Sequence, residues 1–216
     1  MDFTWTAEEA AFRDRVRAFL AQELPDDWPE IARHGPGSVE QTAFSLNFCP
    51  RLAEAGLFVP HWRKDWGGEG RSAWDQQILG EEMWSAGEPR GAQYYSVNWL
   101  GPVLLRYCTP EQRDRWIPPM AGGRTIWCQG FSEPGAGSDL AALRTRAVRE
   151  GDEYVINGQK IWTSYAGLAE QCFLLARTGP VDQGKAGIAI FVVPMSAPGI
   201  EVRAIPSMIG HGDIHE

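Results

Sequence analysis

The feature of this sequence that most restricts its fold is a change in the spacing of its apolar residues near residue 122. Before that point apolar side chains recur every three or four residues, which is the period of an α-helix. After it they fall in short runs bounded by glycine, proline and asparagine, which is the pattern of β-strands. Helices followed by strands, rather than alternating with them, predict two segregated domains and argue against a doubly wound parallel sheet.

The first part of the chain carries clear helix-start signals. Thr6 and Glu9 form a capping box ahead of apolar residues at helical spacing. Thr109 and Gln112 form a second box, with proline in the first turn. Further helices are expected from Ser38 to residue 56 with an interruption near Pro50, around residues 74–83, and around residues 100–104.

The second part of the chain predicts strands over residues 125–131, 143–149, 154–156, 160–164, 172–177, 188–193 and 200–205. Asn157 and Gly158 stand between two of these runs, and this pair favours a tight hairpin turn because both residues tolerate positive φ. We therefore predict an α+β fold, with an N-terminal all-α helical domain over residues 1–122 and a β-domain over residues 123–216.

Charge and composition restrict the partners of the chain. Its 216 residues include 28 acidic and 20 basic side chains, a net charge of -8, with no cluster of Lys or Arg. Nucleic-acid binding is not expected, because phosphate backbones require a concentrated basic surface. No apolar run approaches the roughly 20 residues of a membrane span and the start lacks a signal-peptide pattern, so we expect no membrane association and a cytoplasmic location. The four cysteines form no CxxC pair, which gives no support to a zinc site or a redox dithiol and favours buried free thiols.

Residues 130–142, GFSEPGAGSDLAA, form the most informative stretch of the chain. Gly135, Ala136 and Gly137 leave a bare backbone whose amides can approach an anion closely, and Ser132 and Ser138 add hydroxyl donors. Local composition alone also fits a tight surface turn built on proline and glycine. The stretch is not a dinucleotide fingerprint, because leucine stands where the third glycine belongs, and it is not a P-loop.

Four ordered motifs resemble the acyl-CoA dehydrogenase family. The run through Ser138 and Asp139 is similar to the family signature, and three other segments match it in order and spacing: HWRKDWGG at 61–68, TPEQRDRWIPPMAGG at 109–123 and GDEYVINGQKIWTSYAG at 151–167. The resemblance covers nearly the whole chain. It implies an N-terminal helical domain, a middle β-domain of barrel or sandwich type, and a C-terminal four-helix domain, with FAD between the last two. On this interpretation the chain lacks the C-terminal domain, and its middle domain is incomplete at its C-terminal end.

The resemblance also implies a set of residues that contact the cofactor. Three lie along the flavin edge, two meet the FAD pyrophosphate or the CoA portion of the substrate, and three flank the flavin from the hairpin strand. In that order they are Gln129, Phe131 and Ser132, then Gly137 and Ser138, then Trp162, Thr163 and Ser164. The family usually has threonine where this chain has Ser132 and Ser164, and serine keeps the hydroxyl donor but loses a methyl contact. Taken alone, the period-2 setting of Trp162 also fits a cross-strand core residue.

The chemistry that the resemblance implies is α,β-dehydrogenation of an acyl-CoA thioester. A glutamate removes the α-proton, hydrogen bonds to the thioester oxygen stabilise the developing charge, and FAD accepts the β-hydride. The family's glutamate lies in the C-terminal domain, so we assign no catalytic residue. Glu133 is expected to accept loop amides, and Asp139 to cap or brace the segment that follows it. His211 and His215 match no closed set of metal ligands.

Two functions remain open. The chain is either the front part of an FAD-dependent acyl-CoA dehydrogenase, inactive alone, or a non-catalytic accessory subunit that contributes flavin-binding surface to a partner chain. Members of the family act on acyl-CoA substrates, pass electrons to electron-transfer flavoprotein or a similar acceptor, and form homo- or hetero-oligomers. Residues 127–143 are similar to the branch of the family that handles bulky acyl groups, including sterol side chains.

Overall fold

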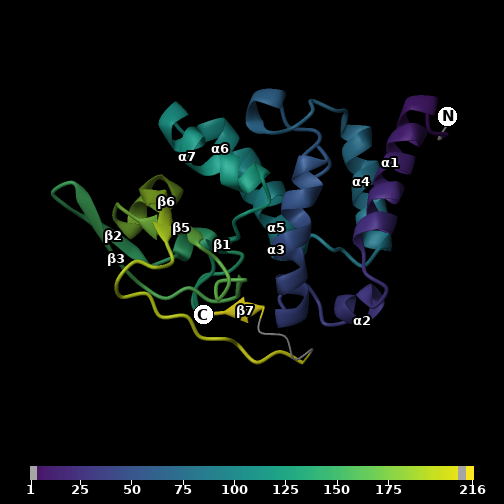
Figure 1. Ribbon diagram of the computed structural model, residues 1–216. Helices are drawn as coiled ribbons and strands as arrows, with labels where there is room; N and C mark the ends of the chain where they lie inside the picture. The colour runs from purple at the N-terminus through teal and green to yellow at the C-terminus, as the bar shows by residue number, and fades with distance from the viewer. Residues whose placement is uncertain (1–3, 209–212) are drawn as a thin grey trace. The chain divides into compact units, whose positions relative to one another are not determined.

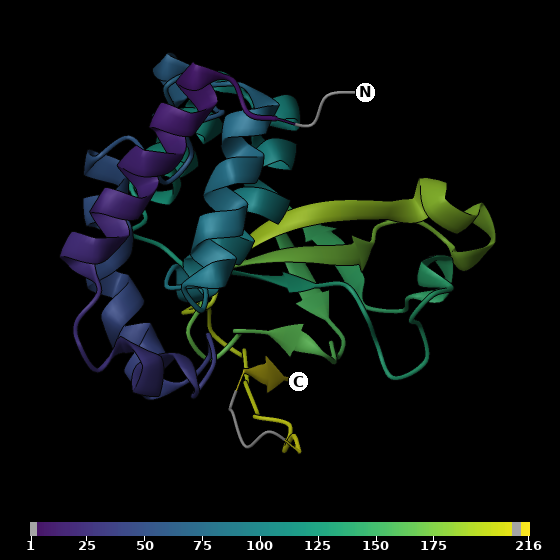
Figure 2. The same cartoon turned by 90° about the vertical axis from the view of Figure 1, so that its right-hand side faces the viewer.

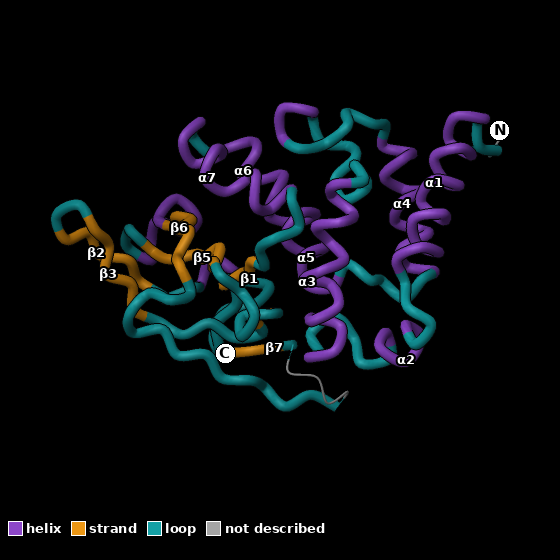
Figure 3. The backbone as a smooth tube through the Cα atoms, in the orientation of Figure 1, coloured by secondary structure: helices purple, strands orange, loops and turns teal. Residues whose placement is uncertain are grey.

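The computed structural model describes residues 4–208 and 213–216 of the chain. The chain divides into two compact units, Met1–Thr125 and Ile126–Glu216, whereas we expected the division after residue 122. The first unit is helical and the second holds the strands, as the purple and orange segments of Figure 3 show. This order confirms the predicted α+β fold class. None of the helices in the described ranges is long and apolar enough to cross a membrane.

The first unit consists of helices joined by turns and loops. In chain order they are α1 (Ala7–Glu23), α2 (Trp28–Ala32), α3 (Val39–Glu54), the 3-10 turn η1 (Lys64–Trp66), α4 (Ala73–Ser85), α5 (Gly91–Tyr95), the π-helical segment η2 (Ser96–Leu100), α6 (Gly101–Tyr107) and α7 (Pro110–Ala121). Helices α1 and α4 lie side by side in Figures 1 and 2. Their buried residues include Phe12 and Val16 of α1 and Ile78 and Met83 of α4, so the apolar stripes of both helices belong to the core of the unit.

The predicted helix starts are confirmed. The Glu9 amide donates to Thr6 Oγ1 at 3.2 Å while the Thr6 amide donates to Glu9 Oε2 at 2.8 Å, and Thr109 and Gln112 form the same reciprocal pair at α7. Ser38 caps α3 by accepting the Gln41 amide at 3.1 Å.

The predicted interruption near Pro50 is wrong, because α3 continues through it to Glu54. Proline removes one amide donor from a helix, and the carbonyl freed here is four residues earlier, on Leu46. Leu46 is 47% exposed, so water can replace the lost donor. Cys49 and Leu52, on either side of the proline, are fully buried and hold the helix in place.

The second unit contains a five-stranded mixed sheet and a two-stranded sheet. Its elements are β1 (Trp127–Gly130), η3 (Leu140–Ala142), β2 (Arg146–Glu150), β3 (Glu153–Asn157), β4 (Thr163–Ser164), β5 (Gln171–Arg177), η4 (Val181–Gly187), β6 (Ile188–Pro194) and β7 (Ile214–His215). Strand β5 pairs with β1 and β2 in parallel and with β6 antiparallel, and β2 forms a hairpin with β3. Strands β4 and β7 form the small antiparallel sheet.

The predicted hairpin turn at Asn157 and Gly158 is wrong. The turn between β2 and β3 contains Gly151, which has φ 63°, and Asn157 is the last residue of β3. Gly158 instead lies against Thr145, whose Oγ1 would be 2.2 Å from a Cβ at position 158. Glycine is therefore needed at 158 for close approach, whereas positive φ is needed at 151.

One predicted strand is shorter than expected, and another is absent. The run at 160–164 forms ladder pairs only at Thr163 and Ser164, because the Ile161 amide donates to a turn rather than to a strand. Residues 200–205 form no strand, and a single bridge joins Ala204 to His215.

Candidate functional site

The glycine-serine stretch forms a tight turn directly after β1. The amides and carbonyls of Glu133 and Ala136 bond to each other, at 2.8 Å and 3.0 Å, and Ala136 is buried against Leu143 and Leu175. Gly135 and Gly137 are exposed, and no heavy atom lies within 4 Å of the point where either would carry a Cβ. The turn is therefore anchored at one residue and leaves the backbone of its glycines open on the surface.

Glu133 fixes the turn from within. Its carboxylate accepts the amides of Arg144 at 2.7 Å and Thr145 at 2.9 Å, which confirms the prediction that Glu133 accepts loop amides. It also accepts Lys160 Nζ at 2.9 Å. Burial acts to raise the pKa of Glu133, but the Lys160 ammonium and the backbone donors outweigh it and lower the pKa to about 2. Glu133 is thus a fixed anion rather than a proton acceptor.

Asp139 braces less than expected. It occupies the N-cap position of η3, but its side chain makes no capping hydrogen bond, and only its carbonyl accepts the Ala142 amide, at 3.1 Å. The segment is instead held by Arg177, whose buried guanidinium donates to the carbonyls of Ala141 and Leu143 at 2.6 Å and 3.1 Å.

The turn after β1 and the segment before β4 are joined by hydrogen bonds. The Ile161 amide donates to the Ser132 carbonyl at 3.0 Å, and Lys160 Nζ donates to the Phe131 carbonyl at 3.0 Å as well as to Glu133. Two stretches that are distant in the sequence therefore lie side by side, since Phe131 and Lys160 are 29 residues apart. This bridge places the start of the Trp162–Ser164 segment next to Ser132.

Trp162 lies at the surface in an unusual conformation. Its side chain is 61% exposed and its backbone has φ 60°, which is an outlier for a bulky residue. The interpretation of Trp162 as a cross-strand core residue is therefore wrong. An exposed indole on a strained backbone leaves a flat apolar face available, and such strain concentrates at functional sites.

The other residues expected at the site divide into three groups. Gln129, Phe131, Ser132 and Ser164 are half-buried, and Phe131 stacks on Phe173 with ring centroids 6.2 Å apart. Gly137 and Ser138 are exposed on the turn. Thr163 is buried, and its Oγ1 has no hydrogen-bond partner.

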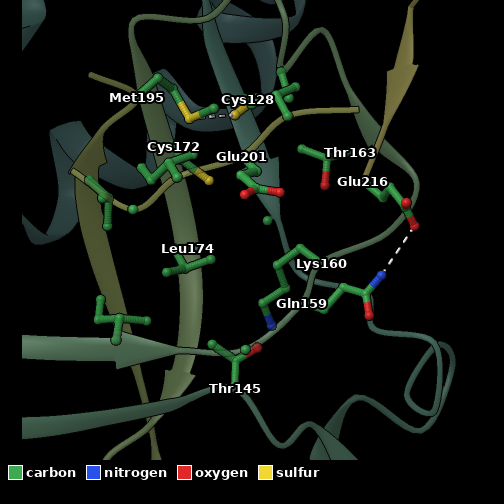
Figure 4. Close-up of a pocket in the computed structure, with 18 of the residues that line it drawn as sticks. Cys128, Thr145, Gln159, Lys160, Thr163, Cys172, Leu174, Met195, Glu201 and Glu216 are labelled. Atoms are coloured by element: carbon green, nitrogen blue, oxygen red, sulfur yellow. Dashed lines mark hydrogen bonds between the residues drawn. The ribbon is translucent and has the colours of Figure 1, made fainter. Parts of the chain in front are cut away.

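A cavity of about 500 Å³ lies within the second unit, and Thr163 and Lys160 both line it (Figure 4). Trp162 and Ser164 do not line this cavity. The structure thus joins Phe131 and Ser132 to the segment of Trp162 and Ser164, whereas the Thr163 side chain belongs to the interior of the unit.

Lys160 is the functional residue that our sequence reasoning missed. Burial lowers the pKa of its ammonium group, and the hydrogen bond with Glu133 opposes that effect. A charged lysine between polar and apolar residues at the start of an expected strand was the signal for an internal ion pair, but its partner lies 27 residues away in the sequence.

Among the described residues, the histidines form no metal centre. His215 is buried and pairs with Thr163 in the small sheet, while His211 lies outside the described residues. Within residues 4–208 and 213–216, no group of three or more His, Cys, Asp or Glu side chains is arranged to hold a metal ion.

Comparisons with known proteins agree on one family. The profile of the acyl-CoA dehydrogenase N-terminal domain matches residues 6–124, and that of the acyl-CoA dehydrogenase middle domain matches residues 128–215. Acyl-CoA dehydrogenase IpdE1 of Mycobacterium tuberculosis is 39% identical over 207 residues, which is 95% of this chain and 54% of that protein. The chain spans about half the length of the curated relatives it matches.

Solved structures are also similar over the whole chain. The ChsE4-ChsE5 complex from Mycobacterium tuberculosis matches with a TM-score of 0.85 and 33% identity, over 100% of this chain and 56% of that one. The Tcur3481-Tcur3483 steroid ACAD matches with a TM-score of 0.86 and 35% identity, over 100% of this chain and 57% of that one.

Proposed function

The chain belongs to the acyl-CoA dehydrogenase family, and we propose that it forms the flavin-binding front part of an FAD-dependent enzyme that dehydrogenates an acyl-CoA thioester. The observation that carries the proposal is the bridge from Ile161 and Lys160 to the carbonyls of Ser132 and Phe131. This bridge brings an open glycine turn and an exposed tryptophan onto one unit. Those are the two features that an aromatic ring with a diphosphate tail requires.

The residues present fit such a cofactor. The exposed amides around Gly135 and Gly137 can approach phosphate oxygens closely, because neither glycine has a neighbour within 4 Å of its Cβ position. The indole of Trp162 offers a flat face, and Ser132 and Ser164 offer hydroxyl donors to a polar ring edge. FAD, when bound, supplies the hydride acceptor of the reaction.

No described residue of the site is suited to remove the α-proton of the substrate. Glu133 is held as an anion with a pKa of about 2, far below the value at which a carboxylate is an effective base near neutral pH. The residues of this chain therefore bind and orient, and we assign no catalytic base among them. In this proposal, electron-transfer flavoprotein or a similar acceptor takes up the electrons from the reduced FAD.

We further propose that the acyl group is bulky and derived from a steroid. The support comes from the relatives, since one matched structure is a steroid ACAD. A binding titration with a steroid-derived acyl-CoA and with butyryl-CoA, each against the FAD-loaded chain, measures the preference. Tighter binding of butyryl-CoA would contradict this part of the proposal.

The alternative is an accessory subunit that lends its flavin-binding surface to a partner chain. This alternative is supported by two matched structures that each pair two proteins, ChsE4 with ChsE5 and Tcur3481 with Tcur3483. The two proposals differ in FAD binding by the chain alone. An accessory subunit retains FAD only when its partner is present.

The experiment that tests the proposal is FAD retention by the purified chain through gel filtration, measured by flavin absorbance. We expect Trp162→Ala to weaken FAD binding about 5- to 150-fold, since base or ring stacking on an aromatic side chain contributes about 1–3 kcal/mol. Trp84→Ala is the matched control, because Trp84 is 60% exposed and lies on α4 in the other unit. Equal FAD affinity in the two variants would contradict the assignment of Trp162.

A further inference from the structure

Three sulfur-containing side chains gather in the wall of the cavity in the second unit. Cys128, Cys172 and Met195 all line it, and Cys128 Sγ lies 3.9 Å from Met195 Sδ (Figure 4). The two cysteines are 44 residues apart in the sequence, so their spacing gave no sign of a dithiol. The fold creates the pair, and nothing in the proposed flavin site uses it.

The two cysteines are direct neighbours on adjacent strands. Cys128 of β1 and Cys172 of β5 are Cα partners in the parallel ladder, so their side chains point to the same face of the sheet. Neighbouring strands lie about 4.8 Å apart, within the range of roughly 4.4–6.8 Å that Cα atoms of a disulfide span. A bond between the two sulfurs therefore requires no change of register.

Cys172 is the more reachable and more activated of the two thiols. It is 8% exposed on a cavity wall, whereas Cys128 is 0% exposed. A Cβ at position 130 would lie 3.0 Å from Cys172 Sγ and 3.4 Å from Lys160 Cγ. The sulfur and the aliphatic part of the lysine side chain therefore both pack over the bare backbone of Gly130. A side chain at residue 130 would push the thiol and the lysine apart.

The charges around the pair favour a thiolate on Cys172. The hydrogen bond with the Cys128 thiol lowers the pKa of Cys172 and outweighs the burial of Cys172, which acts to raise it. The Gly130 amide and the Lys160 ammonium also lower the pKa of Cys172. The pKa of Cys128 is raised by Cys172 and by burial. Other charged groups on the cavity wall are Glu201, Arg203 and Glu216, and Glu201 is paired with Arg203 at 2.7 Å.

We propose that Cys172 is a redox modification site, at which a hydroperoxide entering the cavity oxidises the sulfur and Cys128 then closes a disulfide between β1 and β5. In the first step the Cys172 thiolate attacks the peroxide, an S–O bond forms, the O–O bond breaks, and one proton is taken up to release an alcohol or water. The sulfur loses two electrons and the peroxide gains them.

In the second step the Cys128 sulfur attacks the sulfenic sulfur of Cys172. The S–S bond forms, the S–O bond breaks, and the hydroxide that leaves takes the thiol proton of Cys128 to give water. A dithiol reductant reverses the change by exchange. This inference concerns the second unit alone and does not rest on the proposed flavin chemistry.

The test treats the intact, native chain with a small excess of hydrogen peroxide, alkylates the remaining thiols, and maps unreduced tryptic peptides by mass spectrometry. We expect a cross-linked species of peptides 125–144 and 161–177, two hydrogens lighter than their sum, which disappears on reduction. In Cys128→Ala we expect a dimedone adduct on Cys172, since the sulfenic acid has no thiol to resolve it.

Cys108 provides an internal control for exposure. It is half-buried, hence more exposed than Cys172, and burial raises the pKa of its thiol. We expect Cys172 to react with peroxide at least about tenfold faster than Cys108, following thiolate character rather than exposure. Faster oxidation of Cys108, or loss of the Cys172 thiol without any 125–144 to 161–177 cross-link, would overturn the proposal.

Discussion

The pair formed by Glu133 and Lys160 shows what a buried charge does in this unit. The side chains are 8% and 11% exposed, and the nitrogen and oxygen lie 2.9 Å apart. Each charge satisfies the other, and both also hold backbone groups, namely the amides of Arg144 and Thr145 and the carbonyl of Phe131. The pair therefore joins the glycine turn to the segment before β4 at a single point.

Removing one charge of this pair should be far more harmful than removing an exposed one. In Glu133→Gln, the Lys160 ammonium stays buried without its counter-charge, and we expect a loss of about 3 kcal/mol in the free energy of unfolding. Glu201→Gln is the control, because Glu201 and Arg203 are 77% and 70% exposed and their pair should contribute less than about 1 kcal/mol. Urea denaturation followed by circular dichroism measures both. Equal losses of unfolding free energy in the two variants would show that the buried pair contributes no more to stability than the exposed pair.

The same carboxylate predicts how stability depends on pH. Its folded-state pKa of about 2 lies below the ordinary value of 4.5, so the folded state favours the charged form. That stabilisation is complete above pH 4.5 and is lost as the pH falls towards 2. We expect the free energy of unfolding of the native chain to fall more steeply over this range than that of Glu133→Gln. Parallel curves for the two proteins would contradict the assigned pKa.

Residue roles were predictable where the partners are near in sequence or the motif is specific. Glu133 was expected to accept loop amides and does so. Lys160 could not be foreseen, since an internal lysine is recognisable only through a partner that the fold brings to it. Thr163 was grouped with Trp162 and Ser164 by the motif, but only the structure shows its side chain buried in the cavity wall.

At the scale of elements, helix starts were readable and strand connections were not. A capping box such as Thr6 with Glu9 is complete within four residues, so the sequence alone carries it. A hairpin turn depends on which strands pair, and the Asn157-Gly158 signal was outweighed by the pairing of β2 with β3 around Gly151. Gly151 and Gly158 both occupy special backbone positions, but for different reasons: Gly151 has positive φ, and Gly158 approaches Thr145 closely.

Substitution of the glycines should separate these reasons. Gly158→Ala places a Cβ 2.2 Å from Thr145 Oγ1 and 2.7 Å from the Thr145 Cα, so the backbone must shift, and we expect a loss of about 1–3 kcal/mol in unfolding free energy. Gly135→Ala is the control, since its added methyl group meets nothing within 4 Å and its φ is not positive. Thermal unfolding monitored by circular dichroism compares the two. A Gly158 variant as stable as the Gly135 variant would mean that the contact with Thr145 is not close in solution.

At the scale of the whole molecule, the expected cofactor contacts are distributed unevenly. All eight residues predicted to meet the cofactor, from Gln129 to Ser164, lie in the unit Ile126–Glu216. The four motifs that identified the family are spread over both units, which is why the family and the α+β fold were predictable from the sequence. The substrate class rested on relatives, since no residue of the described site reports the size of an acyl group.

This distribution predicts where FAD should act on the chain. A ligand that binds only the folded state at a concentration 100 times its Kd stabilises that state by about 2.7 kcal/mol, so amides that open with the site should exchange about 100-fold more slowly. Hydrogen exchange measured by mass spectrometry, with and without FAD, locates the effect. We expect protection in peptides that cover residues 127–138 and 160–165, and we expect Trp162→Ala to reduce it while Trp84→Ala leaves it unchanged. If the chain gains protection only once a partner subunit is added, the accessory-subunit alternative is favoured. Protection confined to residues 4–125 would contradict both alternatives, because every proposed contact with FAD lies beyond that range.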